Sequence, residues 1–485
     1  MRNVRFVGID VGTTSVKAAV IDETGQVVSR YSQRYPTRRQ AGGIVEQNPL
    51  DWLRLVNQAL AEMELEGVVA VGLTSQVNTH VFVGANGAAL RPAIVWQDGR
   101  AQSAAKKLDA QVTTKDKLKW WGAPMPIDAS HACSRMAWVA ENEPNIWDQT
   151  RMDVLPKDYV AFHLTGVSVT DAVSSIGLVD QALAYVPEVL DLVAGARDRV
   201  APLSGMMDPV GLIKDGPLRG VPLICGTMDA WAGLVGTGGA RDGTSMYLSG
   251  TSEILGISSQ TIVPTPGAVV FPNYDGIRLH AAPTQSGGDA KMWFAQTQAM
   301  TLDEMAALVA ATPASTATPM FLPQLQGERA PLWDADLRAA FLGISRATGQ
   351  GDFARAVYEG VALAARMAME TLQASADVKS DVILCGGGGF KSEPWTQIRA
   401  DILGAELRVL DSGEPGVLGA AMMAGVGAGH FAHITDALGA LATFDRTYTP
   451  DPTQRARSDD LYALYGDAIT QTSNLGKRLT QLNSR

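Results

Sequence analysis

The sequence contains little cysteine, and the few cysteines it has form no cluster. Among 485 residues there are three, Cys133, Cys225 and Cys385, with no CxxC pair. An odd, sparse set of this kind argues against a disulfide-stabilised secreted protein. The set favours a reducing compartment, so we expect a cytoplasmic protein.

Long hydrophobic runs and an excess of positive charge are also absent. The most membrane-like stretch, residues 416–429, is too short to span a bilayer and is rich in glycine. It predicts a buried helix packed closely on a neighbour. Lys and Arg number 40 against 50 Asp and Glu, a net charge of −10. This balance argues against a nucleic-acid or membrane surface, and the length predicts two or more domains.

Several well-known catalytic and phosphate-binding motifs are missing, including GxxxxGK[ST], a complete GxGxxG, GxSxG and HExxH. Residues 8–22 instead read GIDVGTTSVKAAVID, in which an apolar run ends at Asp10 before a turn crowded with hydroxyls. With the residues around it, this stretch predicts an antiparallel meander of strands at 4–10, 16–22 and 27–35. We also expect a helix over residues 49–63.

Two later apolar runs, VVAVGLTSQ and VPLICGTMDA, predict strands that stop at polar residues. RPAIVWQDGR has the same form and ends near Asp98. Ligands of open α/β sheets bind at the carboxyl ends of strands. We therefore expect a ligand site where these strands end.

The opening plan of strand, turn and strand occurs again in TSMYLSGTSEILGIS, residues 244–258. This layout predicts a degenerate duplication, with a second α/β domain starting near residue 242. Residues 381–392, DVILCGGGGFKS, predict a strand, a glycine loop and the start of a helix. The residues after about 450 predict a helical tail.

The two turns have the composition of phosphate sites. Residues 12–15 and 249–252 combine glycine with hydroxyls, so several donors can surround phosphate oxygens. A carboxylate ending a buried strand, as Asp10 does, is costly unless it meets a cation, and hydrated Mg²⁺ is the natural partner beside phosphate. Residues 386–389 lack Cβ atoms, which lets a flat ring lie on the backbone. Simple hairpin turns and a flexible loop stay open as alternatives.

Long motifs across residues 4–445 resemble the FGGY carbohydrate kinases of the actin-like ATPase superfamily, and the xylulokinase group most of all. They include GIDVGTTSVKAAVID, RPAIVWQDGRA, LPKDYVAFHLTG, LPQLQGERAPLWD and GGGGFKSEPWTQIRADILGAEL. The resemblance implies an α/β fold of two actin-like (ribonuclease H-like) domains facing each other across a cleft. It also implies transfer of the γ-phosphate of ATP to a sugar or polyol hydroxyl.

The resemblance implies a role for each matching residue. Asp229 falls on the catalytic base, and Asp10 on the residue that serves Mg²⁺. The nucleotide contacts would be Thr13, Thr14 and Ser15 in the first turn, Gly250 and Thr251 in the second, Gly288, and Gly387, Gly388 and Ser392 around the adenosine. Residues 1–242 would be the sugar-binding domain, 243–445 the nucleotide-binding domain and 446–485 a helical tail.

The sugar side departs from the family pattern. Where xylulokinases have a sugar-contacting Met and His, this chain has Val77 and Asn78, and Ala230 follows the base. A role of Asp98 in sugar contact and a structural pair with Arg100 are equally open. We expect D-xylulose as substrate. The alternatives are another pentulose, polyol or sugar acid, or a non-catalytic nucleotide sensor on the same fold. The expected partners are the sugar and ATP, and a homodimer stays open.

Overall fold

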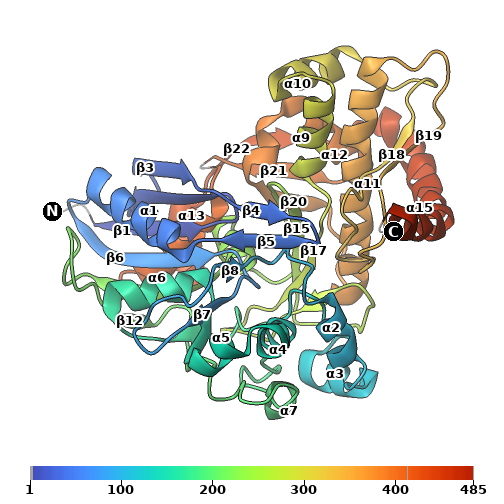
Figure 1. Ribbon diagram of the computed structural model, residues 1–485. Helices are drawn as coiled ribbons and strands as arrows, with labels where there is room; N and C mark the ends of the chain where they lie inside the picture. The colour runs from blue at the N-terminus through green and yellow to red at the C-terminus, as the bar shows by residue number, and fades with distance from the viewer. Residues whose placement is uncertain (1–3, 412, 484–485) are drawn as a thin grey trace. The chain divides into compact units, whose positions relative to one another are not determined.

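The computed structural model describes residues 4–411 and 413–483, which divide into two compact units (Figure 1). Unit 1 comprises residues 1–240, 271–278 and 414–443, and unit 2 comprises 241–270, 279–413 and 444–485. Each unit has its own sheet and hydrophobic core. None of the helices in the described residues is both long and apolar enough to cross a membrane.

Unit 1 is built on a six-stranded sheet with the order β12-β13-β6-β1-β2-β3. The strands are β1 (Arg5–Val11), β2 (Ser15–Asp22), β3 (Val27–Arg34), β6 (Val68–Ser75), β12 (Pro209–Leu212) and β13 (Pro222–Met228). The first three form the predicted antiparallel meander, and β6 and β13 run parallel to β1. The carboxyl ends of β1, β6 and β13 therefore lie at one edge of the sheet.

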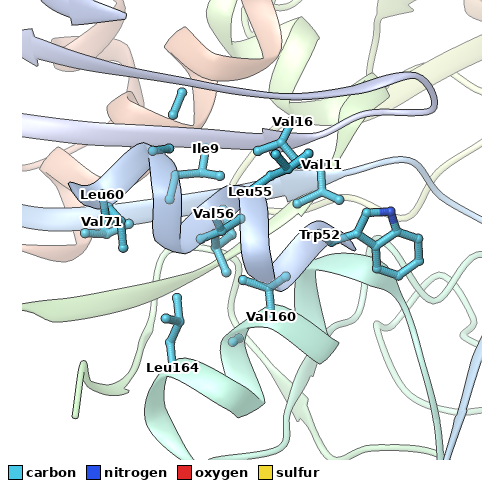
Figure 2. Close-up of a cluster of buried hydrophobic side chains, with 14 of the residues drawn as sticks. Ile9, Val11, Val16, Trp52, Leu55, Val56, Leu60, Val71, Val160 and Leu164 are labelled. Carbon is cyan, nitrogen blue, oxygen red and sulfur yellow. The ribbon is translucent and has the colours of Figure 1, made fainter. Parts of the chain in front are cut away.

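Helices cover both faces of this sheet. Helix α1 (Pro49–Glu62) is capped at its N-terminus by Asn48, whose side chain accepts from the N–H of Leu50. The helix buries Trp52, Leu55 and Val56. Figure 2 shows these side chains packed against strand residues and against α6 (Pro156–Thr165). Burying a large apolar side chain stabilises the fold by about 1.5–3 kcal/mol. This cluster therefore anchors the strands that carry the first turn.

Helix α13 (Pro415–Gly427) is the predicted glycine-rich helix, and it is buried as expected. In Figure 1 it lies beside β1 although some 400 residues separate them in the chain. A Cβ on Gly8 would lie 2.0 Å from the carbonyl oxygen of Val417, and one on Gly72 would lie 2.0 Å from that of Ala420. The contact thus depends on glycine, because any side chain would push the helix off the sheet.

Smaller elements complete unit 1. Its remaining strands pair in small sheets: β4 (Arg38–Gln40), β5 (Ile44–Gln47) and β8 (Ala93–Ile94); β7 (Val81–Val83) with β9 (Met152–Val154); and β10 (Thr170–Asp171) with β11 (Leu203–Ser204). The remaining helices are α2 (Gln102–Asp109), α3 (Thr114–Trp121), α4 (Ala132–Asn142), α5 (Pro144–Gln149), α7 (Pro187–Leu190), α8 (Asp229–Gly236) and α14 (Ile434–Leu441). The stretch RPAIVWQDGR yields only the two-residue β8, which pairs with β5 outside the main sheet.

Unit 2 repeats the plan of unit 1 in a seven-stranded sheet with the order β16-β17-β15-β14-β20-β21-β22. Its strands are β14 (Ser245–Ser249), β15 (Glu253–Ser258), β16 (Val269–Val270), β17 (Leu279–Pro283), β20 (Val382–Gly386), β21 (Glu406–Leu410) and β22 (Phe444–Tyr448). An antiparallel meander is again followed by two parallel strands and an antiparallel edge strand. The repeated layout agrees with the predicted duplication.

The helices of unit 2 include the 27-residue α11 (Gln350–Ala376), most of which is buried. The others are α9 (Gly288–Thr297), α10 (Leu302–Ala311), α12 (Glu393–Leu403) and α15 (Arg455–Asn483), with short 3-10 turns η1 (Gly388–Lys391) and η2 (Pro452–Gln454) and the strand pair β18 (Met320–Leu322) and β19 (Ala340–Leu342). The expected helical tail is α15.

The packing units differ from the linear ranges expected from the sequence. Residues 414–443, grouped above with 243–445, pack in unit 1 because α13 lies against β1 and β6. The crossing at Ala240 and Arg241 lies close to the expected boundary at 242. As sugar-binding and nucleotide-binding domains, the ranges 1–242, 243–445 and 446–485 stay a prediction.

Candidate active site

The first turn follows β1, and hydrogen bonds to its carbonyl groups hold it in place. The N–H of Gly12 donates to the carbonyl of Ser15 at 3.1 Å, which closes the hairpin. Tyr35 donates its hydroxyl to the carbonyl of Gly12, and the amide of Gln47 donates to the carbonyl of Thr13 at 2.7 Å. Because the carbonyls are engaged in this way, the turn has a fixed shape. Of its hydroxyl residues, Thr14 is exposed, Thr13 half-buried and Ser15 buried.

Asp10 lies at the end of β1 among charged groups of unit 1. Burial raises the pKa of Asp10 to about 7; Lys17 opposes the shift, whereas Asp229 and Glu414 add to it. Its Oδ1 atom is buried and accepts no hydrogen bond from any part of the chain that the structure describes. A carboxylate in this state is poised to receive a cation.

Lys17 and Glu414 are two site residues that the sequence analysis did not assign. Lys17 pairs with Asp10 across β1 and β2, and its Nζ atom lies 2.6 Å from Oε2 of Glu414. Burial alone would lower the pKa of Lys17, but Glu414 and Asp10 raise it above its ordinary value. Glu414 stands immediately before α13, so only the packing of that helix brings it to the first turn. Lys17, in contrast, was visible in the motif itself.

Asp229 is the first residue of α8, directly after β13, and is half-buried. The N-cap of α8 is Met228 rather than Asp229. One carboxylate oxygen of Asp229 accepts from the N–H of Ala230 at 2.8 Å. Because Met228 pairs with Ser75 and Val11 pairs with the same Ser75, Asp229 lies at the strand edge that also carries Asp10.

The loop after β6 places Val77 and Asn78 at this edge, both half-buried. Asn78 has φ of 54°, a left-handed conformation that asparagine tolerates better than most residues. Its amide nitrogen donates to the hydroxyl of Ser130 at 3.2 Å. The preceding Gln76 is fully buried and donates to Gln47 at 2.8 Å, so one amide network links this loop to the first turn.

Asp98 has a structural role. Its carboxylate accepts from the N–H of Val45 at 2.6 Å and from the guanidinium of Arg100 at 2.7 Å, and Arg135 lies 3.3 Å away. Burial alone would raise the pKa of Asp98, but these partners lower it. Of the two roles left open by the sequence, the structure shows the pair with Arg100. Nearby, the indole of Trp96 donates to the hydroxyl of Thr13 at 3.0 Å and steadies the first turn.

In unit 2, the candidate nucleotide residues gather around the turn between β14 and β15. The N–H of Gly288 donates to the carbonyl of Gly250 at 3.0 Å, and that of Asp289 to the carbonyl of Thr251 at 2.9 Å. A Cβ on Gly288 would lie 2.4 Å from the carbonyl oxygen of Gly250. The start of α9 can therefore approach this turn only because residue 288 is glycine.

The glycine loop after β20 lies against the same turn. Gly387 has φ of 98°, and a Cβ there would lie 2.5 Å from the carbonyl oxygen of Ser249. At Gly388 a Cβ would meet nothing within 4 Å, so the backbone there is open to a ligand. Ser392 is the half-buried N-cap of α12. Unit 2 thus brings together the second turn, the start of α9 and the glycine loop.

A buried ion pair supports the second turn from inside unit 2. Arg399 and Glu253 form a salt bridge, and both are almost fully buried. Arg399 also donates to the hydroxyl of Ser249 at 2.7 Å and lies 3.5 Å from the ring centre of Trp395. Lys291 lies 4.5 Å from the same ring, and burial lowers the pKa of Lys291 to about 8. Arg399 therefore ties Glu253 and Ser249 together beneath the turn, while its Nε and Nη1 atoms have no hydrogen-bond partner in the described part of the chain.

Comparisons with known proteins agree with this arrangement. Residues 5–236 match the N-terminal domain and residues 246–428 the C-terminal domain of the FGGY family of carbohydrate kinases. The chain belongs to this family and is a sugar kinase. It is 27% identical to a xylulose kinase from Bacillus subtilis, over 98% of both chains.

Solved structures with the same fold include kinases named for other substrates. A gluconate kinase from Lactobacillus acidophilus superposes with a TM-score of 0.87 at 24% identity, covering 97% of this chain and 98% of that one. A glycerol kinase from Plasmodium falciparum with ADP gives a TM-score of 0.83 at 21% identity, over 97% and 98%. These likenesses establish the two-domain actin-like α/β fold, and the sugar has to be argued from the site.

Proposed function

We propose that this sugar kinase is an ATP-dependent ketose kinase that converts D-xylulose to D-xylulose 5-phosphate, with Asp229 as the catalytic base. The observation that carries the proposal is the position of Asp229 directly after β13, at the strand edge that holds Asp10 and the first turn. The relative named xylulose kinase supports the choice of sugar.

The chemistry follows from these positions. A sugar hydroxyl is a poor nucleophile, so the carboxylate of Asp229 takes its proton as the new O–P bond forms and the bond to the ADP oxygen breaks. Thr13, Thr14 and Ser15 in unit 1, and Gly250 and Thr251 in unit 2, bind phosphate oxygens. Because phosphoryl transfer needs little covalent help, most of the catalysis comes from positioning and charge.

The surroundings of Asp10 fit a magnesium ion. Its Oδ1 atom is a buried acceptor without a hydrogen-bond partner among residues 4–411 and 413–483. In the same residues no group of three His, Cys, Asp or Glu could hold a metal ion. Magnesium commonly takes one or two carboxylates and completes its shell with water and phosphate oxygens. When bound, magnesium would neutralise phosphate charge. The adenosine would be held by Gly387, Gly388 and Ser392.

The identity of the sugar rests on the loop after β6. Val77 and Asn78 are the proposed sugar contacts, and they differ from the residues typical of xylulokinases. Another pentulose, a polyol or a sugar acid is therefore the alternative substrate. A coupled assay of ADP release over ketoses, aldoses, polyols and sugar acids decides between them, and D-xylulose should give the highest kcat/KM.

Asp229→Asn tests the proposed base. We expect kcat on the best sugar to fall by about 10²–10⁴-fold, the usual contribution of a positioned base, with nucleotide affinity and melting temperature preserved. Asp148→Asn, at an exposed position in unit 1, is the matched control and should behave as wild type. Near wild-type turnover by Asp229→Asn would remove Asp229 from the mechanism.

A further inference from the structure

Unit 1 contains a cavity of about 30 Å³ that is lined in part by Asn78. Half of the lining is apolar, and the other polar residues besides Asn78 are His80, Asp153, Asp158, Thr170, Ser174, Ser175 and Tyr185. A cavity of this volume has room for about two water molecules. It can therefore hold a hydroxymethyl-sized end of a ligand, but not a whole sugar.

His80 and Asp153 form a buried pair on this wall. His80 precedes β7, whose Phe82 pairs with Asp153 on β9. Its Nδ1 atom lies 2.9 Å from one carboxylate oxygen of Asp153 and 3.2 Å from the other, and the two side chains are 6% and 1% exposed. A carboxylate that accepts from Nδ1–H leaves Nε2 of a neutral imidazole as an acceptor.

The Nε2 atom of His80 is buried and has no hydrogen-bond partner within the described part of the chain. A buried polar atom left without a partner is unfavourable, so such atoms in native proteins usually serve water or a ligand. An O–H donor in the cavity would satisfy it.

The carboxylates around the cavity outnumber the cations that pair with them. Lys157 is the shared partner of two carboxylates, Asp158 at 2.6 Å and Asp171 at 2.9 Å. Asp153 contributes a third carboxylate, paired with His80. A carboxylate ligand would meet like charge here, whereas a neutral hydroxyl would not.

The cavity is lined by Asn78 and lies near the strand that precedes the proposed base, since the hydroxyl of its lining residue Ser174 is 3.4 Å from that of Thr227. His80 is two residues from Asn78 in the loop after β6. Asp171 accepts from the hydroxyl of Thr227 at 2.8 Å, and Thr227 is two residues before Asp229 on β13. The segments that carry the sugar contact and the proposed base thus also form the surroundings of the cavity.

We propose that this cavity is a subsite for the terminal hydroxyl-bearing group of the substrate, with His80 accepting its O–H, and that it selects neutral ketoses and polyols over sugar acids. The proposal rests on the proposed function, because it assumes that sugar binds beside Asn78. His80, oriented by Asp153, is then the residue that determines this specificity.

The test compares His80→Asn with the matched control His163→Asn. The amide nitrogen of an asparagine at position 80 can take the place of Nδ1 and donate to Asp153, so the buried carboxylate keeps a partner, but the shorter side chain has no acceptor at the position of Nε2. His163 lies on α6, with its ring 4.5 Å from that of Tyr159 and outside the cavity wall. Calorimetry measures the Kd values for D-xylulose, xylitol and D-gluconate. The experiment also measures ADP release with and without each sugar, and the melting temperature of each protein.

We expect wild type to bind the neutral sugars at least about tenfold more tightly than gluconate. His80→Asn should weaken binding of the neutral sugars by about 10- to 100-fold, since a buried hydrogen bond is lost. Its melting temperature should stay close to that of wild type, and the control His163→Asn should bind each sugar as wild type does. Should His80→Asn fail to fold, Ala132→Leu fills the cavity from α4 without removing a polar group, and it should weaken binding similarly.

Each result bears on the subsite separately from the kinase function. Gluconate bound as tightly as the neutral sugars by wild type, or a folded His80→Asn with unchanged Kd values, overturns the subsite, even if phosphoryl transfer proceeds. Selective binding of neutral sugars that is lost in His80→Asn supports the subsite, even if no sugar is phosphorylated. In that case the proposed function falls instead.

Discussion

Replacing Asp10 by asparagine should stabilise the protein at alkaline pH while removing its activity. The pKa of Asp10 is raised from 3.8 to about 7 in the folded protein, chiefly by burial. Between these two values the folded state holds the proton more firmly than the unfolded state does. The contribution of Asp10 to the free energy of unfolding therefore falls as the pH rises from about 4 to 7, and it stays low at higher pH.

The magnitude follows from the two pKa values. A difference of about three in pKa corresponds to about 4 kcal/mol. Because the side chain is only half-buried, solvent screening reduces the cost of the ionised form to on the order of 1–3 kcal/mol. Asparagine has nearly the same shape and no charge. Asp10→Asn should then melt about 2–8 °C above wild type at pH 8 without Mg²⁺, and by a smaller margin at pH 5, where only part of the loss has occurred.

Calorimetric melting at pH 5 and pH 8, with and without Mg²⁺ and a non-hydrolysable ATP analogue, measures this difference. Bound metal requires the ionised carboxylate, so the ligands should stabilise wild type more at pH 8 than at pH 5 and have less effect on the variant. Asp22→Asn in the same hairpin is the control. Hydrogen bonds from Thr24 and Gln26 lower the pKa of Asp22 despite some burial, so its loss should destabilise equally at both pH values. An Asp10→Asn protein that melts below wild type at pH 8 would refute the reasoning.

Three further substitutions, two of them with a comparison variant, test the second turn and the sugar loop. Thr251→Val should raise the KM for ATP by about tenfold through loss of a phosphate donor, with sugar affinity unchanged. Equal KM values for the variant and wild type would show that the second turn does not bind the phosphates. Gly288→Ala should destabilise unit 2 and lower nucleotide affinity, because its Cβ would lie 2.4 Å from the carbonyl oxygen of Gly250. In the control Gly388→Ala the Cβ would meet no atom within 4 Å, so this variant should melt at the same temperature as wild type. Asn78→Ala should lower kcat/KM on the best sugar by about 10- to 200-fold. Asn78→Gly keeps the left-handed backbone at φ of 54°, so if glycine restores activity, Asn78 acts only through its backbone.

Local pattern was sufficient for the parts of the site that lie within one stretch of chain. The meander around Gly12, the strand–turn–strand around Gly250 and the buried character of α13 all agree with expectations drawn from alternation and glycine placement. These features depend on neighbours in the sequence, because a tight hairpin is determined by its turn residues and by the side-chain period of its strands.

Contacts between distant segments could not be predicted in this way. Glu414 reaches Lys17 only because glycines at positions 8 and 72 let α13 lie on the sheet. Asp98 proved to be a partner of Arg100 and Arg135. The pairing of Glu414 with Lys17 and that of Asp98 with its arginines depend on which charged side chains come into contact after folding. The sequence pattern does not contain that information.

By itself, the sequence determined the class of fold, the two turns and the chemical character of Asp10 and Asp229. The class of fold followed from the resemblance of long motifs to a known family, and the turns and the two aspartates belong to short segments whose residue types restrict their conformation and chemistry. Only the tertiary structure decided the ionisation of Asp10, the pairing of Lys17 with Glu414 and the cavity beside Asn78. Those properties arise from burial and from the distances between charges on separate segments, and both come into existence only when the sheet and its helices pack together.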